Sequence, residues 1–153
     1  LGKEFANSKG SMFLGRGYSY PIALEGALKL KELAYVHAEG YPAGEMKHGP
    51  LALIEEGMPV VVIAPRDEHY KKTISNMQEV ISRGAKVLLI TNKSTDEIYS
   101  ENIWEQIEVD AISDELIPFL TTIPLQKLAY YSALDKGYDI DKPRNLAKSV
   151  TVE

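Results

Sequence analysis

Three charged residues occur at helical spacing in an otherwise apolar segment, and this pattern is a candidate for acid–base chemistry. Glu25, Lys29 and Glu32 stand at positions i, i+4 and i+7, so in a helix they share one face. One interpretation is an ordinary Glu–Lys pair that stabilises the helix by about 0.2–0.5 kcal/mol. The other is a polar stripe lining a site, in which a partly desolvated carboxylate moves protons. The spacing leaves both interpretations open.

Two basic residues are further candidates, because each lies in a segment that is unusual for its position. His48 precedes a Gly49-Pro50 break, which indicates an exposed loop. A histidine there is either structural or a general acid–base. Lys148 lies in the tail 143–153, which lacks the composition of a disordered end. It is either a solvated charge or an amine that a pocket holds neutral for Schiff-base formation.

A glycine-containing turn is predicted at 15–20, where the sequence GRGYSY begins like a dinucleotide-binding motif. Tyr20 replaces the third glycine of that motif, so close packing against a pyrophosphate is not expected. The segment is either a plain turn or a weak anion site at the start of the next helix. The other histidines, His37 and His69, have no metal-ligand cluster around them at recognisable spacing.

These candidates must be positioned by an alternation of strands and helices. The apolar runs predict strands at 11–14, 36–39, 58–64, 86–91 and 107–109, and the periodic segments predict helices from 21, 67 and 114. Ser19 is a possible helix cap, and Gly84 and Gly137 are possible helix ends. The alternation predicts a three-layer α/β/α domain with a mostly parallel sheet of about five strands.

Ligands in such folds bind beyond the carboxyl ends of the strands, near a switch in strand order. This rule directs attention to the turn at 15–20, to the loop around His48, and to any tail that folds over that edge. A loop with room for about one helical turn is expected between Pro42 and Pro50.

Composition excludes several classes of protein. The chain has 153 residues, of which 44% are hydrophobic and 25% charged, as expected for one globular domain. Its net charge of −5 argues against a broad nucleic-acid surface. No segment has the length of a membrane span or the pattern of a signal peptide. The absence of cysteine excludes disulfides and a cysteine nucleophile, and it fits a reducing cytosol. Because Leu1 rather than Met begins the sequence, we expect a fragment of a longer chain.

Four runs of the sequence together resemble the glutamine:fructose-6-phosphate aminotransferases. The runs are FLGRG at 13–17, YPIALEGALKLKE at 20–32, HAEGYPAGEMKHGPLALI at 37–54 and DKPRNLAKSVTVE at 141–153. The resemblance implies the second of two sugar-isomerase (SIS) domains in the isomerase half of a cytoplasmic enzyme of hexosamine biosynthesis. That family makes glucosamine 6-phosphate from fructose 6-phosphate and glutamine. We therefore expect residues 1–137 to form the SIS domain and residues 138–153 a C-terminal catalytic tail.

The resemblance also implies a role for each candidate on the predicted helix and loop. It implies that Glu32 shuttles a proton between C1 and C2 of the sugar and that Lys29 lies near the ring or C5 oxygen. Glu25 matches a supporting acidic residue on the same face. His48 matches a histidine linked to ring opening, which in the family reaches the site from the neighbouring subunit.

For the tail, the resemblance implies that Lys148 forms an imine with the open-chain ketose and that Arg144 and Ala147 line the ammonia path and the sugar. No metal or organic cofactor is implied. The implied partners are a sugar phosphate, the first SIS domain and the glutaminase (glutamine amidotransferase) domain of the same parent chain, and a second copy in a homodimer. Neither nucleic acid nor a membrane is expected. The fragment alone is expected to be inactive.

Two other functions are compatible with the same fold. One is a non-catalytic SIS module that binds sugar phosphates, as in regulators, although a regulator needs no Glu–Lys–Glu stripe together with a lysine tail. The other is an SIS isomerase or deglycase that acts on another phosphosugar, against which the PRNLAKSVTVE run argues. The fold cannot separate these alternatives.

Overall fold

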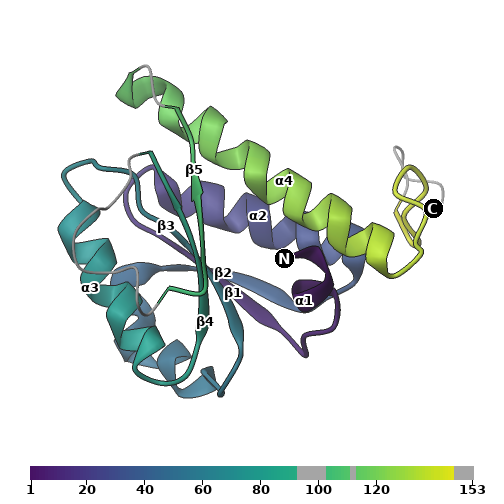
Figure 1. The fold of residues 1–153 in the computed structure, drawn as a ribbon, viewed down its shortest axis with the longest axis horizontal. Coiled ribbons are helices and arrows are strands. Elements are labelled where there is room, and N and C mark those ends of the chain that lie inside the picture. Colours follow the sequence, from purple (N-terminus) through teal and green to yellow (C-terminus); the bar gives the residue numbers. More distant parts are fainter. Residues whose placement is uncertain (93–102, 111–112, 147–153) are drawn as a thin grey trace, which may run out of the picture.

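The computed structural model describes residues 1–92, 103–110 and 113–146. Five parallel strands form one sheet in the order β2-β1-β3-β4-β5 (Figure 1). The strands are β1 (Ser11–Gly15), β2 (Ala38–Pro42), β3 (Pro59–Ile63), β4 (Lys86–Thr91) and β5 (Glu105–Glu108). The predicted parallel five-stranded sheet is therefore confirmed, and the switch in strand order lies between β1 and β3.

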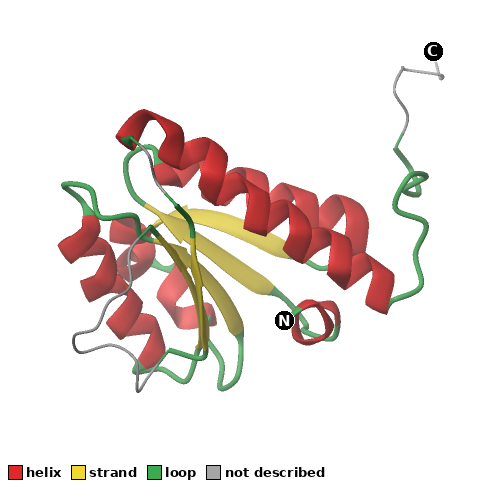
Figure 2. Ribbon diagram, turned by 45° about the horizontal axis from the view of Figure 1, so that its top comes forward, coloured by secondary structure: helices red, strands yellow, loops and turns green. Residues whose placement is uncertain are grey.

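Helices cover both faces of the sheet (Figure 2). One face carries α1 (Gly2–Ala6), α2 (Ser19–Ala34) and α4 (Ile117–Asp135), and the other carries α3 (Tyr70–Ile81). Short 3-10 helices occupy the connections: η1 (Ala43–His48), η2 (Pro50–Leu53) and η3 (Asp114–Leu116). The architecture is the predicted three-layer α/β/α sandwich. None of the helices within the described ranges is long and apolar enough to cross a membrane.

The core is divided in two by the sheet. Phe13, Val61 and Leu88 pack against α2 and α4, whereas Met12, Val60 and Leu89 face α3. Successive side chains of a strand point to opposite faces, so a strand covered on both sides must be apolar at every position. This explains why β3 is buried along its whole length.

The observed starts of two helices, α2 and α3, differ from the predicted ones. Helix α3 begins at Tyr70 and not at Asp67, because Asp67 Oδ1 accepts a hydrogen bond from the His69 N–H (2.8 Å) and forms a turn. Ser19 is the first residue of α2 and is buried, so its prediction as a cap is wrong. Gly137 follows α4 with a positive φ of 70°, as predicted for a helix end.

The direction of α2 and α4 determines where their last residues lie. Both helices start near the carboxyl edge of the sheet, after β1 and β5 respectively, and run back across it. About 20 Å of helix separates Ser19 from Glu32, so Glu32 lies at the opposite, amino edge. The C-terminal ends of α2 and α4 lie side by side there (Figures 1 and 2).

Candidate active site

The charged stripe of α2 is an ion-pair cluster centred on Lys29. Lys29 Nζ lies 2.7 Å from Glu32 Oε2 and 3.5 Å from Glu25 Oε1. The Lys29 and Glu32 side chains are each 29% exposed. The helical spacing therefore predicted correctly that the three side chains share one face. The half-buried carboxylate of Glu32, paired with the Lys29 ammonium group, can exchange protons with a ligand that lies over it.

The carboxylates raise the pKa of Lys29 above its usual value of 10.5. The main cause is the hydrogen bond to Glu32, and the charges of Glu25 and Glu32 add to it, while partial burial acts in the opposite direction. Lys29 is therefore protonated at neutral pH. It can donate a hydrogen bond to an oxygen atom, but it cannot serve as a base.

This pKa shift predicts a change in stability at high pH. A group whose pKa is higher in the folded state stabilises the fold below its unfolded pKa and loses that contribution as the pH rises through the folded value. Between pH 9 and pH 12 the wild-type chain should therefore lose more free energy of unfolding than the Lys29→Met variant, by no more than about 1 kcal/mol because the pair is partly solvated. Urea unfolding across this pH range measures the difference. Lys31→Met, an exposed lysine of the same helix, is the control and should behave as wild type. Parallel curves for Lys29→Met and wild type would contradict the assignment.

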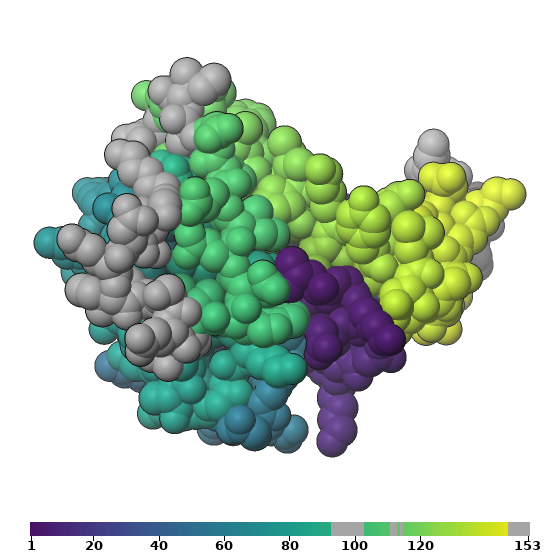
Figure 3. Space-filling view, in the orientation of Figure 1, coloured from purple at the N-terminus to yellow at the C-terminus, as the bar shows by residue number. Residues whose placement is uncertain are grey.

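Glu32 also lines a cavity of about 520 Å³ that the beginning of the tail helps to form. The lining residues are Leu28, Lys31, Glu32, Tyr35, Val36, His37, Arg144, Asn145 and Leu146. The cavity lies at the amino edge of the sheet, where the Ser11 N–H of β1 donates to the His37 carbonyl (3.0 Å). Figure 3 shows this described part of the tail at one end of the molecule, beyond α4.

The cavity lies at a different edge of the sheet from the one that the sequence rule indicates. The general rule for parallel sheets placed the site, and any tail folded over it, at the carboxyl ends of the strands. The tail up to Leu146 instead lies at the amino edge, because α4 runs back across the sheet before the tail begins. Glu32 and Arg144 thus line the same cavity, but at the amino edge of the sheet and not at the carboxyl edge.

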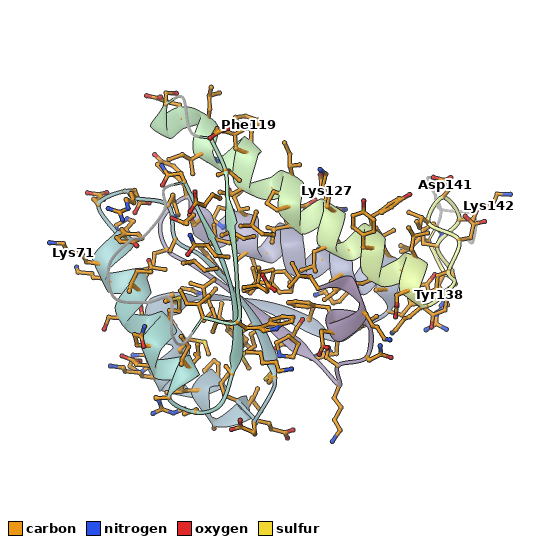
Figure 4. All side chains as sticks on the ribbon, viewed as in Figure 1. Lys71, Phe119, Lys127, Tyr138, Asp141 and Lys142 are labelled. Carbon is orange, nitrogen blue, oxygen red and sulfur yellow. The ribbon has the colours of Figure 1, made fainter. Side chains whose placement is uncertain are left out.

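Tyr35 holds the described part of the tail against α2. Its hydroxyl accepts a hydrogen bond from the Arg144 N–H (2.8 Å), and the Arg144 guanidinium lies 4.1 Å from the centre of its ring. The ring of Tyr138, at 4.8 Å, supports Tyr35 from the end of α4. Figure 4 shows Tyr138 at that end, next to the loop with Asp141 and Lys142. Tyr35 was not a candidate from the sequence.

The remaining predicted site residues are not all assembled within this chain. Glu25 and Lys29 contact each other, but neither is part of the cavity lining. His48 is 73% exposed on η1, 4.0 Å from Glu45, and η1 packs on the α3 face of the sheet. His48 therefore lies across the sheet from Glu32. Ala147 and Lys148 lie outside the described residues.

The turn after β1 is explained by packing. A Cβ atom at Gly15 would collide with the carbonyl group of Ser19, and Gly17 has a positive φ of 52°. Arg16 Nη1 donates to Asn76 Oδ1 of α3 at 3.2 Å. These contacts favour the interpretation of a structural turn. Among the described residues, no group of three His, Asp or Glu side chains is arranged to hold a metal ion.

Comparisons with known proteins identify the family of the chain. The family model for the SIS domain matches residues 4–135. The chain is 54% identical over 151 residues to a glutamine–fructose-6-phosphate aminotransferase (isomerizing) of Bartonella henselae, covering 99% of this chain and 25% of that protein. A glutamine–fructose-6-phosphate aminotransferase (isomerizing) of Rhizobium leguminosarum bv. viciae is 51% identical over 153 residues, which are 100% of this chain and 25% of that protein. The chain thus spans about a quarter of the length of these curated relatives.

Solved structures show the same similarity. The C-terminal domain of glucosamine-fructose-6-phosphate aminotransferase from Francisella tularensis superposes with a TM-score of 0.85 and 48% identity, over 92% of this chain and 40% of that one. A glucosamine-6-phosphate deaminase from Thermotoga maritima superposes with a TM-score of 0.69 and 27% identity, over 97% and 44% of the two chains. By its sequence and by its fold, the chain belongs to the SIS domain family.

Proposed function

We propose that this chain is the C-terminal SIS domain of a glutamine–fructose-6-phosphate aminotransferase and supplies part of its isomerase site. The observation that carries the proposal is the shared cavity of Glu32 and Arg144, which joins a candidate proton-transfer group on α2 to the start of the tail. The identity of more than 50% to named aminotransferases, over nearly the whole chain, supports the same assignment.

In this proposal Glu32 performs the isomerisation. Converting the 2-imino form of the open-chain sugar to a 2-amino aldose requires one proton to leave C1 and one to arrive at C2. A single carboxylate beside both carbons can do this as base and then as acid. Lys29, cationic at neutral pH, donates to the ring or C5 oxygen of the sugar, and Glu25 holds Lys29 from its other side.

The tail supplies the second group. The Lys148 amine attacks the C2 carbonyl of the open-chain ketose and forms an imine with loss of water, and ammonia then displaces the lysine nitrogen from C2. Arg144 and Ala147 line the sugar and the path of the ammonia. Arg144 supports this arrangement because it shares the cavity of Glu32.

His48 opens the sugar ring in this proposal, but in the site of a neighbouring subunit. Its position on the α3 side of the sheet separates it from Glu32 of the same chain. A second copy is therefore needed to complete each site, and we propose a homodimer. A histidine suits this step because its imidazole ring can both accept and donate a proton.

The proposal requires further parts of the same protein. A first SIS domain holds most of the sugar phosphate, and a glutaminase (glutamine amidotransferase) domain releases ammonia from glutamine. The complete enzyme acts in hexosamine biosynthesis in the cytoplasm. It uses no nucleic-acid or membrane partner, in keeping with the net charge of −5.

A further prediction concerns the chain by itself. Its two-sided core should let it fold, but it should form little or no glucosamine 6-phosphate, because the phosphate-binding and glutaminase domains are missing. Far-ultraviolet circular dichroism and an assay with fructose 6-phosphate and glutamine test both parts. Glutamine-dependent product above background would contradict the idea that this chain holds only part of the site.

A further inference from the structure

We infer that Tyr35 is a positioning residue that anchors the C-terminal tail over Glu32. This inference rests on the proposed function and adds to it a group that touches neither the sugar nor the reacting atoms. Tyr35 is the residue at which α2 ends, three positions after Glu32, and both residues line the same cavity. Tyr35 also contacts Arg144 of the tail, so its side chain connects the end of α2 to the tail.

The backbone of Tyr35 is in an uncommon conformation. Its φ of 53° and ψ of 35° lie in the left-handed region, which an aromatic residue rarely adopts. Glycine would end the helix there without steric cost. A tyrosine in this position therefore needs a compensating contact, and such strained residues are concentrated at functional sites.

The compensating contacts are those with the tail. Arg144 donates its backbone N–H to the Tyr35 hydroxyl at 2.8 Å and lays its guanidinium over the ring, 4.1 Å from the centroid. This geometry combines a hydrogen bond with a cation–π contact. Both contacts bind Arg144, the last residue but two of the described tail.

A second set of contacts fixes Tyr35 itself. Tyr138 packs against its ring with centroids 4.8 Å apart. Lys136 lies 5.7 Å from the Tyr138 ring and donates from Nζ to the carbonyl of Ala34 at 2.8 Å. The C-terminal ends of α2 and α4 are thus connected by the Lys136–Ala34 hydrogen bond and by the contact between the rings of Tyr35 and Tyr138. These contacts fix the position of Tyr35, to which the tail binds.

The test uses hydrogen exchange and kinetics of the full-length enzyme that carries this domain. Tyr35→Phe keeps the ring and removes only the hydroxyl, so amide exchange at 144–146 should become about 3- to 10-fold faster. Tyr35→Leu also removes the cation–π contact and should exceed that range. Exchange within α2 and the melting temperature should stay close to wild type in Tyr35→Phe. Tyr130→Phe, an exposed tyrosine of α4, is the matched control.

In the kinetic arm, kcat for glucosamine 6-phosphate formation should fall in the order wild type, Tyr35→Phe, Tyr35→Leu. The KM for fructose 6-phosphate should change by less than about twofold, because the anchor does not touch the sugar, and glutamine hydrolysis should be unchanged. Unchanged exchange at 144–146 in Tyr35→Phe, equal acceleration throughout α2, or an unaltered kcat in both variants would overturn the inference. If the wild-type enzyme makes no amino sugar, the proposed function fails, and the exchange arm alone decides whether Tyr35 anchors the tail.

Discussion

Replacing Glu32 by Gln in the full-length enzyme should lower the rate of glucosamine 6-phosphate formation by about 10²- to 10⁴-fold, the usual contribution of general acid–base catalysis. The glutamine side chain keeps the size of Glu32 and can still face Lys29, but it cannot take a proton from C1. Coupled assays of amino-sugar formation and of glutamine hydrolysis measure the two half-reactions separately. Hydrolysis should be much less affected.

The neighbouring carboxylate provides the matched control for this variant. Glu25→Gln removes the weaker of the two contacts of Lys29, at 3.5 Å, and leaves the Glu32 contact at 2.7 Å. Its effect on the rate should be much smaller than that of Glu32→Gln. If Glu32→Gln isomerises the sugar at nearly the wild-type rate, Glu32 is not the proton shuttle.

The Lys148→Arg variant of the full-length enzyme should lose the covalent adduct with the sugar completely. Arginine keeps the positive charge but cannot form an imine with a ketone. Borohydride reduction in the presence of fructose 6-phosphate, followed by peptide mass spectrometry, should locate the sugar on Lys148 of the wild type. A solvent-exposed lysine, with a pKa of about 10.4, has very little neutral amine at pH 7, so an adduct also requires that the amine enter a pocket. Lys142→Arg, an exposed lysine of the same tail, is the control and should retain the adduct.

Two results would leave Lys148 with only an electrostatic role. One is an adduct on a different lysine in the wild-type protein, and the other is full activity of Lys148→Arg. Either result would remove the covalent step from the proposal without affecting the proton transfer assigned to Glu32.

The parts of the fold that depend on local pattern could be predicted from the sequence. The β-branched run of β3 and the apolar run of β4 are continuous because both faces of the sheet are covered. The Glu25–Lys29–Glu32 stripe followed from the helical repeat alone. The start of α3 could not be predicted as well, because the Asp67 turn competes with a first helical turn for the same backbone N–H groups.

The location of the candidate site depends on contacts that are distant in the sequence. Tyr35 and Arg144 are 109 positions apart, and no spacing rule connects them. The rule for ligand sites in parallel sheets points to the carboxyl edge, whereas the cavity shared by Glu32 and Arg144 lies at the amino edge. The 16 residues of α2 span the sheet and place the last turn of the helix there. Tyr35 and Tyr138 follow α2 and α4 respectively, and no pattern in the sequence indicates that their rings meet.

The activity proposed for the enzyme that carries this domain is the transfer of glutamine-derived nitrogen to fructose 6-phosphate. The most direct test incubates the full-length protein with fructose 6-phosphate and glutamine labelled with ¹⁵N at the amide, and analyses the sugar phosphates by mass spectrometry. We expect glucosamine 6-phosphate that carries the label. A sugar product without nitrogen, such as an aldose phosphate formed by isomerisation alone, or no reaction of fructose 6-phosphate while glutamine is hydrolysed, would contradict it.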